Sequence, residues 1–355
     1  MIYLIVSVVV LAVLGKLAAP FIGRVRRVLL ADDDSALAAK HGLVPRTGLV
    51  VDSPEPDPRA AAAVAAAAAG DWRPAAAHLA EGGTDWDLRW SRLGPFHDLA
   101  VKDDAWLQAW RKEQPENPDA ALLHAHALTG VAWEIRSSAF AKDVSAEQFA
   151  AFHRVLDDAE RASERAAELA PAGDPNPYVV RLAVAMGLGW DNERYRALWA
   201  ELASRAPHHW AGHARALQYW CEKWHGSHEQ MHAFVDASLA TAPPVSMLSV
   251  FKLEAFVEQF SREGRKDSAY RAAPVQQALE QLLADIAAAP ADHHRLPVAR
   301  SWAAMVLVDS GRAAEALPHF RALGRDVVSP WTSYFRDPVE GFAQARVAAA
   351  MATKA

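Results

Sequence analysis

Three Ala-Pro pairs divide the middle of the chain at a fixed interval, in ELAPAG (168–173), SRAPHHW (204–210) and LATAPPVS (239–246). The pairs stand at 170–171, 206–207 and 242–243, so each ends a helical pattern 36 residues after the previous one. Proline lacks the N–H that a helix needs and disfavours helical backbone in the residue before it. A period of this length is typical of a solenoid of two-helix units. The spacing therefore predicts a scaffold, and repeat scaffolds mostly work by presenting a surface.

Apolar residues at spacings of three and four fill the intervals between these pairs. One unit is expected to pair helices over 177–188 and 193–206, and the next to pair helices over 208–221 and 227–239. Glycine in each short connection suits an antiparallel helix hairpin. Because no stretch from residue 59 onwards alternates apolar and polar residues with period two, the domain over 59–355 is predicted to be all-α.

The region before the first Ala-Pro pair carries further helix signals. Residues 84–113 place Trp and Leu at helical spacing, with a break expected near Gly94-Pro95, and residues 119–138 form a separate helix. Ser145 and Gln148 match the capping-box pattern, in which each side chain bonds to the backbone of the other. This pattern predicts the start of a long helix that ends at the first Ala-Pro pair.

The charge, the cysteine content and the absence of certain motifs exclude several classes of function. The 355-residue chain has a net charge of −6, and its basic residues cluster only over 24–27. We therefore expect no nucleic-acid partner. Cys221 is the single cysteine, which excludes an intramolecular disulfide framework and fits a reducing compartment. The sequence contains no phosphate-binding loop and no nucleophile motif, so we predict no cofactor.

The first 30 residues are interpreted as a membrane anchor with a basic flank. The apolar run over 2–23, interrupted by Lys16, is about as long as a bilayer-spanning helix, and the lysine can reach an interface. The positive charges over 24–27 follow the run, which favours an outside N-terminus and a cytoplasmic helical domain. The alternative is a short apolar helix docked on the repeat domain.

Residues 31–58 are interpreted as a linker. They begin with three consecutive aspartates, Asp32 to Asp34, and end in the proline-rich stretch SPEPDP (53–58). Proline at this spacing favours extended backbone over helix. The segment is therefore expected to tether the helical domain to the anchor.

The stretch 297–324 resembles the tetratricopeptide repeat, in which small residues let two paired helices approach and an aromatic residue packs beneath them. Ala304, Ala316 and Phe320 stand at the small, small and aromatic positions. In the central unit Tyr195 stands where the pattern expects a small residue, which argues against regular stacking there. The resemblance implies an antiparallel helix-hairpin solenoid.

Residues 130–240 also resemble an uncharacterised bacterial helical-repeat family related to the tetratricopeptide proteins. The resemblance rests on AWEIRS (132–137), DPNPY (174–178) and KWHGSHEQM (223–231). The chain departs from the usual Lys-Trp-x-Gly-Ser form by placing His225 where a second glycine is common. This family implies a fold and no activity.

His228, Glu229 and His232 match the H-E-x-x-H zinc signature, in which two histidines one helical turn apart bind the metal and the glutamate acts as general base. Glu254 or Glu258 is the candidate third ligand, although nothing in the sequence fixes either. The competing interpretation is that Ser227 caps a helix and that the motif has no metal. A zinc-dependent hydrolase is therefore kept as an alternative function.

Aromatic and cationic residues gather near the same hairpin. Trp224, Lys223, Tyr219 and Arg215 form the candidate partner-binding surface, because concave faces of solenoids use such side chains as anchors. Ordinary helix packing is the commoner role for such aromatics. His126 and His124 face different sides of their helix and are not expected to form a pair.

These observations together favour a binding protein. We expect a scaffold for an unidentified protein or peptide, tethered to the cell membrane as a single-pass protein with its helical domain in the cytoplasm. Besides the zinc hydrolase, the alternative is a purely structural subunit of a larger assembly.

Overall fold

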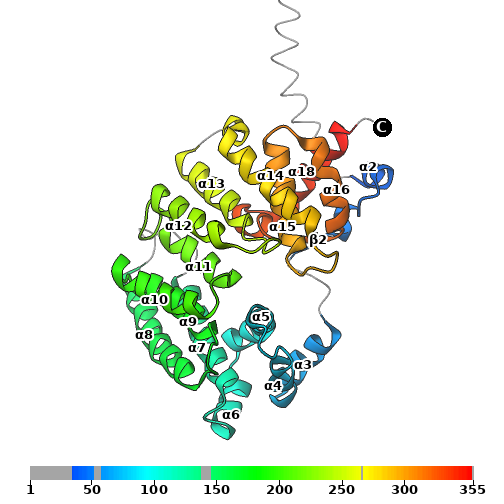
Figure 1. The fold of residues 1–355 in the computed structure, drawn as a ribbon. Coiled ribbons are helices and arrows are strands. Elements are labelled where there is room, and N and C mark those ends of the chain that lie inside the picture. The colour runs from blue at the N-terminus through cyan, green and yellow to red at the C-terminus, as the bar shows by residue number, and fades with distance from the viewer. Residues whose placement is uncertain (1–33, 52–56, 137–144, 265–266, 354–355) are drawn as a thin grey trace, which may run out of the picture. The chain divides into compact units, whose positions relative to one another are not determined.

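The computed structural model describes residues 34–51, 57–136, 145–264 and 267–353. They divide into two compact units, Glu55–Ala242 and Pro243–Ala355, the second of which includes the described part of Met1–Pro54. We call these the repeat unit and the C-terminal unit. Both are helical, and the strands in the described chain are the two-residue β1 (Val50–Val51) and β2 (Asp326–Val327) (Figure 1). The all-α prediction is confirmed for the described residues.

The single helical domain expected over 59–355 is divided at Ala242. The segment that follows contains Pro243 and Pro244, and both Val245 and Met247 have positive φ angles, 65° and 60°. Side chains other than glycine rarely adopt this region, least of all a β-branched one. The backbone between α12 and α13 is therefore not helical at these positions.

The repeat unit consists of consecutive helices joined by short connections. They are α3 (Pro58–Ala68), α4 (Arg73–Ala80), α5 (Trp86–Lys102), α6 (Ala105–Glu113), α7 (Pro118–Arg136), α8 (Ala146–Leu169), α9 (Asn176–Gly187), α10 (Asn192–Arg205), α11 (Trp210–Trp220) and α12 (His228–Thr241). In Figure 1, α7 packs beside α8, α8 beside α9 and α9 beside α10.

The helix ends predicted at 36-residue intervals are confirmed. Ala170, Ala206 and Ala242 are the C-terminal caps of α8, α10 and α12, and each precedes a proline. The capping box at the start of α8 is also present, with Ser145 and Gln148 bonded reciprocally. Local sequence therefore determines where these helices begin and end.

The break expected near Gly94-Pro95 is wrong, because α5 continues through both residues. An internal proline loses one backbone hydrogen bond and costs a helix about 3 kcal/mol. Leu93, Phe96 and Ala100 are buried on one side of α5 and offset this cost. Tertiary packing overrides the local signal here.

The inner helices of the repeat unit curl back on themselves. Helix α5 packs on α7, α7 on α9 and α9 on α11, and α11 then meets α5. At this meeting point the Trp210 amide donates a hydrogen bond to Asp87 Oδ1 at 3.1 Å. The Trp90 and His209 rings lie edge to face there, with centroids 6.3 Å apart. The curl positions residues of α5, α7 and α11 around a common hollow.

The C-terminal unit begins with residues from the other end of the described chain. Its elements are α2 (Ser35–His41), the 3₁₀ turns η1 (Arg46–Gly48) and η3 (Asp267–Arg271), β1, β2, α13 (Val250–Glu263), α14 (Ala273–Ala288), α15 (Leu296–Asp309), α16 (Ala313–Leu323), α17 (Trp331–Tyr334) and α18 (Pro338–Ala352). Ala304, Ala316 and Phe320, the positions that resemble the tetratricopeptide pattern, are all buried between α15 and its neighbours.

The linker predicted over 31–58 is wrong for much of its described length. Residues 35–41 form α2, which packs on α18, and Val50 and Val51 pair in parallel with Asp326 and Val327. The side chain of Asp34 is buried against Arg346. The partners of this segment are some 300 residues away in the sequence, beyond the reach of any local pattern.

Across the described ranges no helix is both long enough and apolar enough to cross a bilayer. The anchor predicted over 2–23 lies outside the described residues.

Candidate functional site

The curl of the inner helices encloses a hollow of about 620 Å³ in the repeat unit. Helix α5 contributes His97, Asp98, Val101 and Lys102, helix α11 contributes Arg215, and helix α7 contributes His126, Thr129, Gly130, Trp133 and Glu134. Small-molecule and cofactor sites commonly enclose about 300–1,000 Å³. The hollow is therefore large enough to hold a ligand.

Along α5, the residues that line the hollow come after those that contact α11. The two helices touch through Asp87 and Trp210, in the first turn of each helix, whereas the lining residues of α5 start ten positions further on at His97. On α7 the lining residues run from His126, near the middle of the helix, to Glu134. The C-terminal halves of α5 and α7 therefore form most of the wall.

Tilted aromatic rings in contact with one another form one side of this wall. His126 lies between Trp90, at a centroid distance of 4.7 Å, and His97, at 4.0 Å. Burial, together with the nearby His97 and Arg215, keeps the pKa of His126 well below its ordinary value, so the ring is neutral at physiological pH. Its Nδ1 is buried and has no hydrogen-bond partner among the described residues.

Gly130 makes the approach of these rings possible. A Cβ atom at this position would lie 2.6 Å from His97 Nε2 and 2.6 Å from Val101 Cγ2. Both distances are far shorter than van der Waals contact. The absence of a side chain on Gly130 therefore lets α5 and α7 pack closely where they line the hollow.

Arg215 is the cation of the wall on α11. Its side chain is exposed to the hollow, but the surrounding protein lowers the pKa of its guanidinium by desolvation, an effect that Tyr195 partly opposes. Within the described residues no hydrogen bond or ion pair involves this guanidinium. Lys102, exposed on α5, is a second cation of the wall.

Two carboxylates also line the hollow. Asp98 Oδ1 lies 3.0 Å from His97 Nδ1, which can donate a hydrogen bond to it. Glu134 is exposed near the end of α7. Both signs of charge are thus present, with acidic groups on α5 and α7 and cations on α5 and α11.

The candidate surface predicted from the sequence is divided by the structure. Arg215 lines the hollow as described, whereas Tyr219 is fully buried. Its hydroxyl lies 2.8 Å from the Trp190 carbonyl oxygen and 2.9 Å from Asn192 Oδ1, and its ring stacks on Tyr195. Tyr219 therefore holds α9, α10 and α11 together and cannot anchor a partner.

Trp224 is half-buried and serves as a packing residue. Its ring is perpendicular to that of Trp133, with centroids 5.4 Å apart, and the Arg136 guanidinium lies 4.9 Å from its centroid. Lys223 beside it is exposed. Trp224 thus connects the α11–α12 loop to α7 directly behind Trp133, which lines the hollow.

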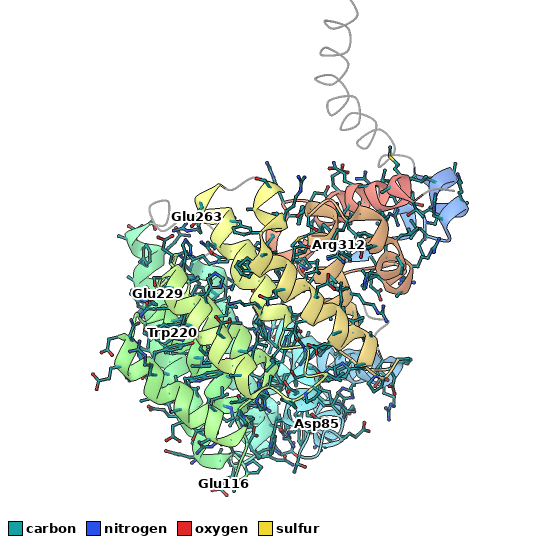
Figure 2. All side chains as sticks on the ribbon, turned by 45° about the horizontal axis from the view of Figure 1, so that its top comes forward. Asp85, Glu116, Trp220, Glu229, Glu263 and Arg312 are labelled. Atoms are coloured by element: carbon teal, nitrogen blue, oxygen red, sulfur yellow. The ribbon has the colours of Figure 1, made fainter. Side chains whose placement is uncertain are left out.

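The predicted zinc motif lies at the start of α12, near the labels Trp220 and Glu229 in Figure 2. Ser227 caps this helix by accepting a hydrogen bond from the Gln230 amide at 3.2 Å, and His228 Nε2 lies 3.3 Å from Glu222 Oε2. His232 is one turn further along α12, whereas Glu254 belongs to α13 of the C-terminal unit. In the described chain no three His, Cys, Asp or Glu side chains are grouped so as to hold a metal ion.

Several wall residues were not predicted from the sequence. His97 and His126 lie 29 positions apart and on different helices, and in the sequence His126 is compared only with His124. Gly130 carries a weak signal, since a glycine inside a helix lowers its stability and usually has a packing reason. No pattern in the sequence indicates which helices meet, so the hollow itself is visible only in the structure.

Comparison with known proteins adds no relative. No family model matches the chain, and neither the curated proteins nor the solved structures give a match. Both resemblances described above therefore stay predictions.

Proposed function

We propose that the repeat unit is a binding module that takes a peptide segment of a partner protein into the hollow between α5, α7 and α11. The observation that carries this proposal is the hollow itself, which is formed by the inner helices of a curled helical array. Repeat proteins use their inner, concave faces for binding.

The chemistry of the wall supports a peptide. The Trp133 ring offers an apolar surface to a side chain, while Lys102, Glu134 and Arg215 can each bond to polar groups of the segment. Aromatic and arginine side chains are the residue types most enriched at the energetic centres of protein interfaces. Membrane attachment through residues 2–23, with the helical units in the cytoplasm, belongs to the same proposal and rests on the apolar run of the sequence.

A rim substitution tests where peptides bind. Glu134→Trp adds a large ring at an exposed wall position and is expected to block the hollow, whereas Lys112→Trp adds the same ring at an exposed position of α6 away from it. Both variants of the full chain, in detergent, are probed with an array of end-blocked peptides of mixed composition.

The wild-type chain is expected to retain a subset of the peptides, the Lys112 variant to retain the same subset, and the Glu134 variant to lose it. Equal retention by both variants would place binding elsewhere, and no retention by the wild type would contradict a peptide-binding function.

A further inference from the structure

We propose that the segment bound in the hollow carries one acidic residue, whose carboxylate pairs with the guanidinium of Arg215. This inference rests on the proposed function and specifies its ligand as a peptide with a single aspartate or glutamate among neutral or basic residues.

The first argument is that Arg215 differs from other arginines of the repeat unit. Many of these are paired with carboxylates: Arg73 with Glu113, Arg92 with Glu81, Arg194 with Glu160 and Arg205 with Glu201. The Arg215 guanidinium has no such partner among the described residues, although it lines a hollow that can admit one.

The second argument concerns solvation. The protein around Arg215 removes part of the water that would otherwise stabilise its charge. Desolvating a charge is unfavourable unless a counterion or hydrogen bonds replace the lost water. His126, which senses the charge of Arg215, is neutral and supplies no negative charge. A carboxylate from a ligand would supply it, and guanidinium matches carboxylate with two parallel hydrogen bonds.

The third argument limits the ligand to one acidic group. Asp98 and Glu134 line the same hollow, and the whole chain carries a net charge of −6. Additional carboxylates on the ligand would therefore meet like charges. Lys102 is the other cation of the wall, but its ammonium group cannot make the two parallel hydrogen bonds that a guanidinium makes with a carboxylate. The expected order of affinity is one acidic residue first, then none, then several.

The test uses the full chain and fluorescently labelled, end-blocked heptapeptides whose central residue is Glu, Gln or Lys and whose other positions are mixtures of neutral residues. A further peptide carries Glu at every second position. Binding is followed by fluorescence anisotropy for the wild type, for Arg215→Gln, and for Arg154→Gln. Arg154 is an exposed arginine of α8 outside the hollow, so its substitution removes the same charge from another place.

The Glu peptide is expected to bind the wild type about ten- to a hundredfold more tightly than the Gln peptide, as a charged bidentate pair implies. This ratio should fall to near one in the Arg215 variant and persist in the Arg154 variant. A wild-type ratio near one, or the same ratio in the Arg215 variant, overturns the inference but not the proposed function. Failure of every peptide to bind overturns the proposed function itself.

Chemical modification keeps the inference testable if the Arg215 variant does not fold. Phenylglyoxal modifies accessible guanidinium groups, and mass spectrometry identifies the arginines modified in the wild-type chain. The Glu peptide is expected to protect Arg215 and leave Arg154 reactive. Modification of Arg215 at the same rate with the Glu and Gln peptides overturns the inference.

Discussion

Asp34 and Arg346 form a buried ion pair across 312 positions of the sequence. Their side chains are only 3% and 1% exposed. Arg346 also donates a hydrogen bond from Nη1 to the Val44 carbonyl oxygen. Because buried charges are tolerated only when paired, this contact fixes residues 34–44 onto the last helix. The segment is thereby an integral part of the C-terminal unit.

Removal of one partner of this pair should destabilise the C-terminal unit strongly. Arg346→Met keeps most of the side-chain volume but leaves the Asp34 carboxylate buried without its cation, at an expected cost of about 3–5 kcal/mol. Urea unfolding of the full chain measures this cost. Arg336→Met, at an exposed position of the same unit, is the control and should change stability by less than about 0.5 kcal/mol. A similar small effect at Arg346 would contradict the buried pair.

Two glycines should respond very differently to substitution by alanine. A Cβ at Gly226 would lie 2.0 Å from the Trp220 carbonyl oxygen and 2.4 Å from its carbon, and neither backbone atom can move without distorting the α11–α12 connection. Gly226→Ala is expected to cost about 3 kcal/mol or more.

Gly94, inside α5, has nothing within 4 Å of the added atom apart from its chain neighbours. Alanine suits a helix better than glycine, but Pro95 disfavours helical backbone in a preceding residue that carries a Cβ, so Gly94→Ala should change stability by less than about 0.5 kcal/mol. Thermal unfolding followed by circular dichroism compares the two variants. The packing described at Gly226 is wrong if its variant is as stable as the wild type.

Asp174 should make the repeat unit less stable as pH rises. Burial raises the pKa of its carboxyl from 3.8 to about 6 in the folded chain, although the Asn176 amide bonds to it. Between these values the folded state holds a proton that the unfolded state has lost, so stability decreases as pH increases through this window. The full effect, above pH 6, is about 2–3 kcal/mol.

Asp174→Asn removes the ionisation and keeps an oxygen that can accept the Asn176 amide. We expect this variant to be more stable than the wild type at pH 8 and equally stable at pH 4. Urea unfolding across this range, with the exposed cap variant Asp85→Asn as control, measures the effect. An unchanged pH profile would show that Asp174 ionises freely.

His319 should have the opposite effect in the C-terminal unit. Burial lowers the pKa of its ring from 6.5 to about 4, so the folded state holds it neutral where the unfolded state would bind a proton. Stability is therefore lost as pH falls from 6.5 towards 4, by about 2–3 kcal/mol from this residue. His319→Gln should lessen this acid sensitivity in melting curves at pH 7 and pH 5, whereas His153→Gln, at an exposed position, should not. Equal acid sensitivity in both variants would refute the assignment.

The features best predicted from the sequence are the helix ends, which depend on residues close to one another in the chain. The ends of α8, α10 and α12 follow from the Ala-Pro pairs, and the start of α8 follows from Ser145. These signals act within one helical turn, so no knowledge of the tertiary structure is needed.

Features that depend on distant partners were missed or misjudged. The aspartate run and the proline-rich stretch assign Asp34 to a linker, and its partner Arg346, 312 positions away, leaves no local signal. Arg215 was named as a candidate binding residue and does line the hollow, but Tyr219, four positions later on α11, is buried by a stack on Tyr195. An aromatic residue such as Tyr219 can belong to a binding surface or to the core. Only the packing of α10 on its neighbours shows that Tyr219 belongs to the core.

Photo-crosslinking tests most directly whether the hollow of the repeat unit is the binding site. The Glu heptapeptide, with a diazirine residue beside its glutamate, is irradiated with the full chain, and the attachment points are mapped by mass spectrometry. We predict crosslinks to α5 over 97–102, to α7 over 126–134 and to α11 around Arg215. Crosslinks confined to the outer helices α8, α10 and α12, or to the C-terminal unit, would contradict the binding site described here.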